Sequence, residues 1–271
     1  MSQTDRQSAC ACHFEMRYEH TSHPAMRALE MGVLGCDYGG TSWTTKSQAE
    51  DIPGLLGLTS ASRLLDIGSG TGWPGLYMAQ LCACEVTLLD LPIHALAQAC
   101  ERGVQDNLRP PVQAVAASGA ALPFPASSFD AIEHSDVLCC LPEKLEMLQE
   151  CRRVTVDGAM MLFYVIAPVP GLGEADYREA LEAGPPFVET PDSYTSLLKT
   201  TGWELLSKTD LTPQYLAATL RLVKGLEAGA TELPEVLGPE VYGEQLSRRR
   251  RQVNAIEQGL LVREMFLVKA F

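Results

Sequence analysis

The sequence predicts an α/β protein whose mostly parallel β-sheet lies between two layers of helices. Short apolar segments with the composition of strands alternate with longer helical segments from residue 63 to residue 166. Parallel strands need crossover connections and are covered by helices on both faces, so this alternation predicts a three-layer sandwich. The chain of 271 residues is 46% hydrophobic, which is enough for one large core.

Seven strands are expected, and the last two are expected to pair antiparallel with helices inserted between them. The inserted segments are Pro213–Leu226 and Pro239–Gln258, and the second repeats apolar residues at helical spacing. Helices between the other strands are expected at 73–82, 93–107, 142–153 and 192–200. The expected strands are 63–67, 85–90, 112–115, 129–134, 159–166, 203–208 and 260–271.

Residues 1–57 are expected to form an N-terminal helical cap, and residues 58–271 are expected to form the core. Two short helices are expected between His13 and Leu34, and another is expected at 45–56. The N-terminal cap and the inserted segment 213–258 are therefore expected to close over the sheet.

Charge and apolar composition exclude several classes of protein. With 21 basic and 34 acidic residues the net charge is −13, which disfavours binding to the phosphate backbone of nucleic acid. Four consecutive arginines, Arg248–Arg251, depart from this acidic composition and are interpreted as the solvated face of a helix. The longest apolar run, Ala159–Val169, has the length of a strand rather than of a membrane span.

Nine cysteines without an export signal predict reduced thiols and a cytoplasmic protein. Residues 1–12 form a polar tail that lacks the apolar stretch of a signal peptide. The cysteines and histidines do not have the spacing of a zinc site. No metal site is therefore expected.

The strongest chemical signal is the glycine-rich segment Asp66–Gly72, which follows an apolar strand and precedes a helix. Glycines allow positive φ and let a ligand approach the backbone, while the helix N-terminus offers its first N–H groups to an anion. The dinucleotide fingerprint G-x-G-x-x-G fails, because Trp73 stands at the third glycine position. A nicotinamide-dependent oxidoreductase is therefore disfavoured.

Two further motifs follow along the chain. Asp90 ends the second expected strand, where a carboxylate can accept hydrogen bonds from both hydroxyls of a ribose. The alternative role for Asp90 is to cap the helix that begins near Pro92. The third motif is Leu122–Asp130, with the sequence LPFPASSFD, immediately before the fourth expected strand.

In this order, the three motifs resemble those of class I S-adenosylmethionine-dependent methyltransferases that act on small molecules. The resemblance covers Arg63–Ile166 and is weaker at 197–203 and 210–212. It implies a Rossmann-like fold, S-adenosylmethionine as cofactor, and in-line displacement of its methyl group onto a small-molecule acceptor. With the cofactor placed across the C-terminal edge of the sheet, the inserted helices at 213–258 are expected to form part of the acceptor pocket.

The resemblance assigns residues to each part of the cofactor. Asp66, Gly68 and Gly70 would line its methionine end, Asp90 would hold the ribose, and Leu91 would pack on the adenine. The full set of expected cofactor-binding residues is Tyr38, Asp66, Gly68, Ser69, Gly70, Gly72, Trp73, Asp90, Leu91, Ser118, Gly119, His134 and Ser135.

One position departs from the family pattern. Ser118, followed by Gly119, stands where the family often has an Asp near the adenine amino group. Adenine recognition is therefore expected to rest on Ser118 and on backbone groups. The backbone of His134 and Ser135 is expected to border the cofactor, and Trp73 either shields its methionine part or covers the helix start.

A general base is needed only if the acceptor atom carries a proton at neutral pH. His134, Asp136, Tyr215 and His94 are the candidates for this role. His134 leads because residues at the carboxyl ends of strands line the crevice of open α/β sheets.

Two other groups of residues have open roles. Tyr38 and Trp43 are expected either to cover the pocket as a lid or to pack the cap. Cys36, Cys139 and Cys140 are more typical of packing, but they would be ligands in a thiol or metalloid methyltransferase. The other alternative is a protein that binds S-adenosylmethionine without turnover, as a partner or regulatory subunit.

Overall fold

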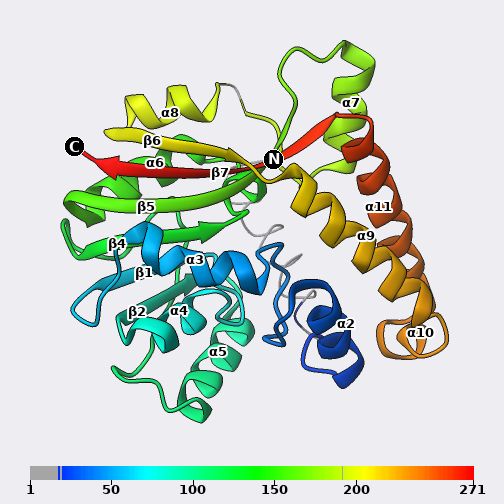
Figure 1. The fold of residues 1–271 in the computed structure, drawn as a ribbon, viewed down its shortest axis with the longest axis horizontal. Helices are drawn as coiled ribbons and strands as arrows, with labels where there is room; N and C mark the ends of the chain where they lie inside the picture. Colours follow the sequence, from blue (N-terminus) through cyan, green and yellow to red (C-terminus); the bar gives the residue numbers. More distant parts are fainter. Residues whose placement is uncertain (1–17, 19, 191) are drawn as a thin grey trace.

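The computed structural model describes residue 18, residues 20–190 and residues 192–271. The expected tail at 1–12 and the start of the helix expected from His13 lie outside these residues. The first helix with bounds is α2 (Pro24–Leu34), and Figure 1 shows the path of the chain from there to the C-terminus.

Seven strands form one sheet in the order β3-β2-β1-β4-β5-β7-β6. β7 runs antiparallel to both β5 and β6, and the other neighbouring pairs are parallel. The predicted mostly parallel sheet with a C-terminal antiparallel strand is therefore confirmed. The strands are β1 (Arg63–Ile67), β2 (Glu85–Asp90), β3 (Gln113–Ala116), β4 (Phe129–Ser135), β5 (Thr155–Pro168), β6 (Trp203–Asp210) and β7 (Leu261–Ala270).

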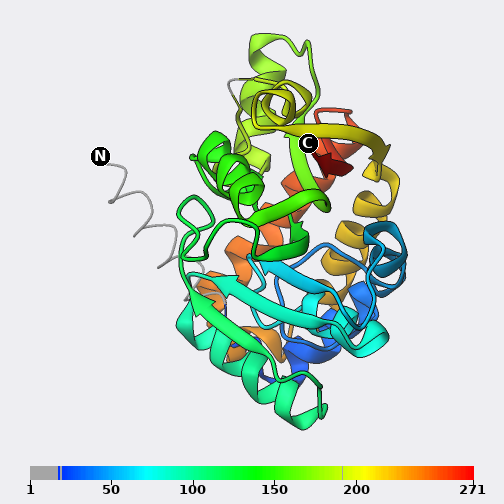
Figure 2. The same ribbon diagram turned by 90° about the vertical axis from the view of Figure 1, so that its left-hand side faces the viewer.

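Helices cover both faces of the sheet, as the right-handed crossover rule requires for this strand order. α4 (Gly75–Cys82) and α5 (Ile93–Gln105) connect strands that step outward from β1, so they share one face with α3 (Lys46–Leu56). α6 (Lys144–Val154) connects strands that step the other way and packs with α8 (Tyr194–Thr200) on the opposite face. Figure 2 shows α3 and α6 on the two sides of the sheet.

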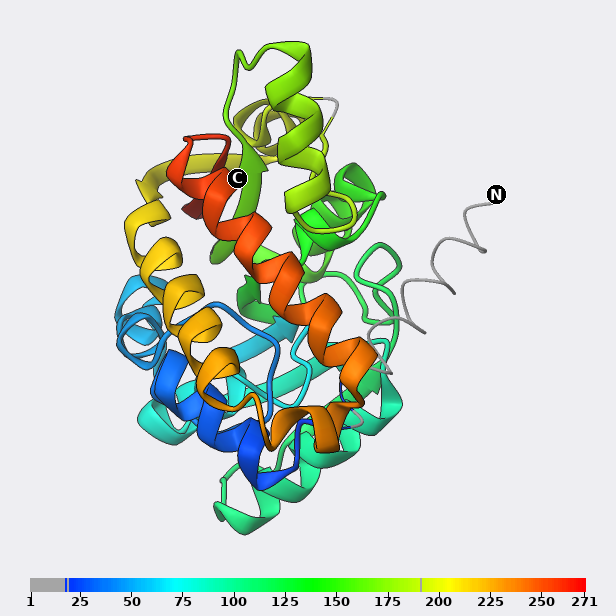
Figure 3. The same cartoon turned by 90° about the vertical axis from the view of Figure 1, so that its right-hand side faces the viewer.

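Four further helices gather beyond the carboxyl ends of the parallel strands. α2, α9 (Thr212–Ala228), α10 (Leu233–Leu237) and α11 (Pro239–Glu257) pack against one another and are here called the cap (Figure 3). In the chain, α9 to α11 lie between β6 and β7. Among the described residues, no helix combines the length and the apolar character needed to cross a membrane.

Two helices are absent from the prediction, and the start of one strand differs from it by more than two residues. The sequence does not predict α7 (Glu174–Ala183), whose buried residues are the two small side chains Ala180 and Ala183. It also does not predict α10, which has only five residues. β5 begins earlier than expected, because Thr155 pairs with Phe129 ahead of a register shift between the two strands.

Local signals fix the ends of the loop that leads into the pocket. Helix α2 ends at Gly35, which takes the left-handed conformation with φ of 80°. Helix α3 begins with a capping box formed by Thr45 and Gln48. The loop from residue 36 to residue 44 is therefore held at both ends, and its residues 40–43 line the pocket.

Candidate active site

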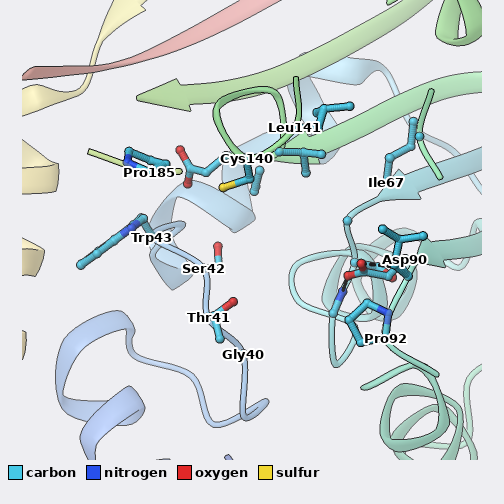
Figure 4. Close-up of a pocket in the computed structure, with 18 of the residues that line it drawn as sticks. Gly40, Thr41, Ser42, Trp43, Ile67, Asp90, Pro92, Cys140, Leu141 and Pro185 are labelled. Atoms are coloured by element: carbon cyan, nitrogen blue, oxygen red, sulfur yellow. Dashed lines mark hydrogen bonds between the residues drawn. The ribbon is translucent and has the colours of Figure 1, made fainter. Parts of the chain in front are cut away.

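A pocket lies where the carboxyl ends of β1, β2 and β4 meet the cap, which is where open α/β sheets bind ligands. What we call the glycine-loop end comprises residues 67–71, 90–92 and 117–119. What we call the cap end comprises Trp43, Cys140, Leu141, Pro185, Pro186 and the α11 residues Arg248, Arg249 and Gln252. Figure 4 shows Trp43, Pro185 and Cys140 on one side of the pocket and Asp90 and Pro92 on the other.

Only glycine fits at the two glycine positions of the loop that line the pocket. Gly68 and Gly70 have φ of 70° and 52°, in the left-handed region that side chains disfavour. A Cβ on Gly68 would collide with the side chain of Val137, and a Cβ on Gly70 would collide with the hydroxyl group of Tyr18. Both glycines line the pocket, so the backbone itself forms this wall.

Asp90 fixes the shape of the glycine loop. Its Oδ2 accepts a hydrogen bond from the Gly70 amide at 2.7 Å, and its Oδ1 accepts one from the Leu91 amide at 2.7 Å. It makes no side-chain cap to α5, whose N-cap residue is Pro92. The helix-capping alternative for Asp90 is therefore wrong, and its half-buried carboxylate lies at the pocket wall.

Two buried hydroxyl groups in the glycine loop test whether a polar ligand fits there. Ser69 Oγ and Thr71 Oγ1 are buried, both residues line the pocket, and neither oxygen has a hydrogen-bond partner among the described residues. A buried hydroxyl without a partner loses its hydrogen bonds to water, which costs about 1–3 kcal/mol. A ligand with polar groups at this point would remove that cost, and the methionine end of S-adenosylmethionine has such groups.

The other expected cofactor residues divide into two sets. Trp73, Leu91, Ser118, Gly119 and Ser135 line the pocket. Gly72 does not line it, and a Cβ on Gly72 would collide with the side chain of Leu76. Tyr38 also lies outside the lining, since its ring packs on Trp73 at 4.9 Å and under the Arg102 guanidinium at 4.1 Å. Tyr38 therefore packs against Trp73 and Arg102, whereas Trp43 lines the pocket.

Asp66 lies behind the glycine loop instead of in the pocket. Its side chain is buried, and its Oδ2 accepts a hydrogen bond from the Gly75 amide at 3.0 Å, at the start of α4. Asp66 is also the register partner of Glu133 on β4, and the two buried carboxyl groups interact with each other. Burial raises the pKa of Asp66 to about 7 and raises that of Glu133 well above its usual value. The expectation that Asp66 lines the methionine end is therefore wrong.

A chain of hydrogen bonds runs from this carboxyl pair toward the cap. Ser135 Oγ donates to Glu133 Oε1 at 2.5 Å and lies 2.9 Å from Thr44 Oγ1. Arg263 Nη2 donates to Thr44 Oγ1 at 3.0 Å. The fully buried Arg263 guanidinium also binds both carboxylate oxygens of Asp136, with Nε–Oδ1 at 2.9 Å and Nη2–Oδ2 at 2.8 Å. Polar groups beneath the pocket are thus linked from β1 to β7.

His134 lies on the opposite face of the sheet from the pocket. Side chains alternate along a strand, so Glu133 and Ser135 face α4 while the imidazole faces the other way. The imidazole is fully buried, stacks on Phe163 at 4.8 Å and has no hydrogen-bond partner among the described residues. Burial lowers its pKa to about 3. The expectation that its side chain faces the acceptor is therefore wrong, whereas the expectation that its backbone borders the cofactor stays a prediction.

The other candidate bases occupy different environments. Tyr215 is buried behind the pocket wall, where its hydroxyl accepts a hydrogen bond from Gln252 Nε2 and its ring meets Trp43 edge-on at 5.0 Å. Burial raises the pKa of Tyr215 above its usual value. His94 is exposed and lies 2.9 Å from Gln98 Nε2, away from the pocket. Asp136 is the candidate that is among the residues lining the pocket.

The arginine run is not a uniformly solvated face. Arg248 and Arg249 are half-buried and line the pocket, and the Arg249 guanidinium lies 4.9 Å from the centre of the Trp43 ring. Arg250 instead pairs with Glu227, and Arg251 is exposed. The interpretation is therefore wrong for two of the four residues. Helical periodicity places Gln252 on the same face as Arg248 and Arg249, which lie four and three residues before it. This shared face is the sequence signal that could have indicated an inward position for the two arginines.

Glu30 is a further residue whose role at the pocket the sequence motifs do not predict. Its buried carboxylate accepts hydrogen bonds from the Gly39 amide at 2.6 Å and the Gly40 amide at 3.0 Å. Burial raises its pKa to about 7. Because Gly40 begins the loop segment that lines the pocket, Glu30 positions that wall from α2.

The three cysteines considered as ligands do not form one cluster. Cys139 is buried, and its thiol donates to the Asp136 carbonyl at 3.2 Å, whereas Cys140 lines the pocket. Cys36 packs in the cap beside Glu30. Within the described part of the chain, no three His, Cys, Asp or Glu side chains are placed to hold a metal ion.

Comparisons with known proteins agree with this arrangement. A protein-family model described as "Methyltransferase domain" matches residues 65–163. A curated relative, 27-O-demethylrifamycin SV methyltransferase of Amycolatopsis mediterranei (strain S699), is 28% identical over 63% of this chain and 64% of its own length. The match therefore spans less than two thirds of that relative.

Two solved structures share the fold at low sequence identity. Phosphoethanolamine N-methyltransferase 2 of Haemonchus contortus, determined with phosphomonomethylethanolamine and S-adenosylhomocysteine, has a TM-score of 0.77 at 18% identity, over 95% of this chain and 60% of that one. The [4+2]-cyclase SpnF has a TM-score of 0.76 at 17% identity, over 100% of this chain and 96% of that one. At this level of identity the similarity concerns the fold.

Proposed function

The chain belongs to the class I S-adenosylmethionine-dependent methyltransferases, and we propose that it transfers the methyl group of this cofactor to a small-molecule acceptor. The observation that carries the proposal is that one pocket joins the glycine-loop end, which holds the cofactor motifs, to the cap end. Methyl transfer needs both reactants in one cavity, because the reacting atoms must be held in line at close range.

S-adenosylmethionine supplies an electrophilic methyl group on a positively charged sulfur, which leaves as a neutral thioether. We assign the ribose to Asp90, because its carboxylate lies at the pocket wall. We assign the polar methionine end to the Ser69 and Thr71 hydroxyls, which are buried and lack partners among the described residues. Leu91 and Ser118 would contact the adenine.

The contribution of the chain to the methyl-transfer step is alignment and exclusion of water. Trp43, Leu141 and Pro185 give the cap end an apolar wall that shields an acceptor from solvent. Asp136 is the predicted catalytic group that lines the pocket, and its bidentate pair with Arg263 fixes its orientation. We propose that it accepts a hydrogen bond from the acceptor and orients it.

The alternative is a protein that binds S-adenosylmethionine and does not transfer its methyl group. A fold similar to the [4+2]-cyclase SpnF over the whole chain is a reason to test this directly. The presence of a second, separately lined end of the pocket favours turnover, because a protein that only binds the cofactor does not need room for an acceptor.

The test is an acceptor screen. The protein is incubated with methyl-labelled S-adenosylmethionine and fractionated small-metabolite extracts, and labelled products are identified by mass spectrometry. We expect a labelled small molecule together with an equal amount of S-adenosylhomocysteine. Tight binding of S-adenosylmethionine without a labelled product from any fraction would contradict the proposal and favour the binding-only alternative.

The proposal also covers the domain organisation of the chain, the class of its acceptor and its cellular compartment. We propose that residues 1–57 form an N-terminal unit whose α2 packs in the cap and whose α3 covers a face of the sheet, that residues 58–271 form the methyltransferase core, and that 213–258 complete the acceptor pocket. The acceptor is proposed to be a small molecule and not a nucleic acid, since the net charge of −13 repels phosphate backbones. The seven cysteines in the described part of the chain are free thiols, which suits the cytoplasm.

A further inference from the structure

The ionisable side chains beneath the pocket wall do not balance in charge. The Arg263 guanidinium is fully buried and binds both carboxylate oxygens of Asp136, so these two charges cancel. Asp66 and Glu133 are buried opposite each other on β1 and β4 and form no ion pair within the described part of the chain. Two carboxyl groups in one buried site do not both ionise, so this carboxyl pair holds a proton near neutral pH.

Ser135 connects the carboxyl pair to the pocket. It is half-buried and is among the residues that line the pocket, and its Oγ donates to Glu133 Oε1 at 2.5 Å. Its second contact is with Thr44 Oγ1 at 2.9 Å, which itself accepts a hydrogen bond from Arg263. Because the Ser135 proton points to Glu133, Thr44 is the donor in this contact. A hydroxyl has one donor and two lone pairs, so one lone pair of Ser135 remains for a ligand.

Asp136 is poorly placed to take a proton from a ligand, although it lines the pocket. Both of its oxygens accept hydrogen bonds from Arg263, at 2.9 Å and 2.8 Å. A proton on Asp136 would leave a fully buried guanidinium without its counter-charge, which is strongly unfavourable. The carboxyl pair has no such partner to lose. Asp136 is therefore suited to orient a ligand, and the carboxyl pair is suited to take up a proton.

The surroundings of the carboxyl pair increase its affinity for a proton. Burial and the nearby charge of Asp90 raise the pKa of Asp66 to about 7. Burial and the charges of Asp66 and Asp136 raise the pKa of Glu133 well above its usual value. A pair with these values can take up a proton near neutral pH and release it again. The other groups on this side are the Gly75 amide of α4, Tyr164 of β5, Arg263 of β7 and, beyond Tyr164, Asp51 of α3.

We propose that the acceptor reacts through a hydroxyl group, and that Ser135 relays the proton of this group to the Asp66–Glu133 pair during methyl transfer. The proposal rests on the proposed function, because it names the reacting group and the proton path of that reaction. The acceptor oxygen forms a C–O bond to the methyl group as the C–S bond breaks. Its proton passes to Ser135 Oγ while the Ser135 proton passes to Glu133 Oε1. The proton carries the positive charge that the sulfur loses, and the pair returns it to solvent after the products leave.

A hydroxyl group fits this path better than other acceptor atoms. A phenol has a pKa of about 10 and keeps its proton at neutral pH, so its oxygen needs a base in the pocket. A thiol ionises more readily, at about 8.5, and a tertiary amine has no proton to give. A protonated amine would be repelled by the positively charged sulfur of the cofactor.

The first experiment follows the proton of the carboxyl pair and needs no acceptor. Infrared spectroscopy at neutral pH detects the C=O band of a protonated carboxyl group, and rapid mixing with D2O shows how fast its proton exchanges. The band of the pair is the one that Glu133→Gln removes, whereas Glu30, with a pKa of about 7, gives a band that remains. The variants are Ser135→Ala, which removes the relay, and Ser135→Thr, which keeps a hydroxyl group. Ser207→Ala is the matched control, because Ser207 is an exposed serine on β6.

We expect Ser135→Ala to slow the exchange by about tenfold or more, the scale of one lost hydrogen bond in the path. Ser135→Thr and Ser207→Ala should exchange at close to the wild-type rate. The thermal unfolding temperature of each variant shows that it is folded.

The second experiment measures kcat with the acceptor from the screen. Ser135→Ala should lower kcat by about a hundredfold or more, the scale of general-base catalysis, while the affinity for S-adenosylhomocysteine changes by less than about threefold. Ser135→Thr should restore most of the activity. Wild-type kcat should fall as the pH drops below about 7, because the pair is then already protonated, and this dependence should disappear in Ser135→Ala.

Several results would overturn the relay. They are equal exchange rates in the wild type and Ser135→Ala, the absence of a carboxyl band that Glu133→Gln removes, wild-type kcat in Ser135→Ala, and a product methylated on nitrogen, carbon or sulfur. The two experiments also separate this inference from the proposed function. Slow exchange in Ser135→Ala without any product in the screen would contradict the methyl transfer alone, whereas a product together with equal exchange rates would contradict the relay alone.

Discussion

The glycine-loop end and the cap end of the pocket are built in different ways. At the glycine-loop end, the backbone forms the wall, and one short segment supplies its shape: Gly68 and Gly70 in left-handed conformations, with Asp90 bound to the Gly70 amide. At the cap end, side chains form the wall, and Trp43 and Arg249 come from opposite ends of the chain.

Because of this difference, the glycine-loop end should tolerate few substitutions, whereas the side chains of the cap end can vary. A backbone wall tolerates few substitutions, because its shape depends on positive φ and on the absence of Cβ atoms. A wall of side chains on packed helices can change one residue at a time while the helices stay in place. The first design suits a cofactor, and the second suits an acceptor that differs between enzymes of one fold.

The largest effect on ligand affinity is expected from Gly68→Ala, which alters the backbone that forms the wall of the glycine-loop end. Alanine at φ of 70° is strained, and its Cβ would collide with Val137. Left-handed strain and overpacking together correspond to about a hundredfold weaker binding of S-adenosylhomocysteine by calorimetry. Gly243→Ala on α11 is the control, since a Cβ there meets no atom within 4 Å. Equal affinity in both variants would show that the loop can rearrange.

The next largest effect is expected from Arg263→Met, which attacks the support of the cap end. It leaves the Asp136 carboxylate unpaired in a site where its side chain is 10% exposed. Loss of one partner of a buried pair costs about 3–5 kcal/mol of unfolding free energy, measured by urea denaturation.

Two further variants sharpen the Arg263 experiment. Asp136→Asn/Arg263→Met should recover part of the loss, and asparagine tolerates the φ of 59° at that position. Arg63→Met is the control, because the pair of Arg63 with Asp130 is exposed and its loss should cost less than about 1 kcal/mol. Equal losses of unfolding free energy for Arg63→Met and Arg263→Met would contradict the expectation that breaking the buried pair costs more than breaking the Arg63–Asp130 pair.

A smaller effect is expected from Asp90→Ala. The variant removes the acceptor for the Gly70 amide and the carboxylate assigned to the ribose. We expect about tenfold weaker binding of S-adenosylhomocysteine, since hydrogen bonds to a charged group are each worth about 1.5–3 kcal/mol. Asp90→Asn should lose less, because its amide oxygen can still accept the bond from Gly70. Wild-type affinity in a folded Asp90→Ala protein would place the ribose elsewhere.

The two ends also differ in how far the sequence predicts them. The strands and the three motifs are local patterns, so β1, β2 and the glycine loop follow from the sequence almost residue by residue. The alternation of side chains along β4 also determines the face on which His134 lies. It can be used only when the face of β4 that meets the pocket is known. A strand-end position alone cannot tell the two faces apart.

The cap end could not be predicted in the same way. Arg248–Arg251 reads as a charged, solvated run, and only the packing of α11 on Trp43 turns two of these residues inward. The buried Arg263 likewise looks like an ordinary strand residue until the fold brings Asp136 beside it from β4. Such contacts join segments more than a hundred residues apart, so no local pattern contains them.

The carboxyl pair behind the glycine loop predicts a pH dependence of stability. Burial raises the pKa of Asp66 from 3.8 to about 7, and that of Glu133 also rises. The folded state therefore retains a proton that the unfolded state releases above its pKa of about 4. This contribution is present at low pH and is lost as the pH rises toward 7.

Glu133→Gln tests this linkage, because the amide can donate to Asp66 and accept from Ser135 without a titrating proton. The fall in unfolding free energy between pH 5 and pH 8 should be smaller than in the wild type by about 1 kcal/mol, the equivalent of one pKa unit. Glu244→Gln, at an exposed position of α11, is the control. Identical pH profiles for all three proteins would show that the pair holds no proton.

The smallest effect on activity is expected from His134→Leu. The imidazole stacks on Phe163, faces away from the pocket and has no polar partner among the described residues, so turnover and cofactor affinity should change by less than about twofold.

The contribution of His134 to the unfolding free energy should depend on pH in the opposite sense to that of the carboxyl pair. Because burial lowers the pKa of His134 to about 3, the wild type loses stability as the pH falls below the unfolded value of 6.5. Leucine removes this loss, so relative to the wild type the variant should gain about 2 kcal/mol at pH 5 over its value at pH 8. Urea denaturation at both pH values measures the gain, and turnover is measured with the acceptor from the screen. Loss of turnover with unchanged binding of S-adenosylhomocysteine would return His134 to the acceptor and would mean that β4 presents its other face to the pocket during catalysis.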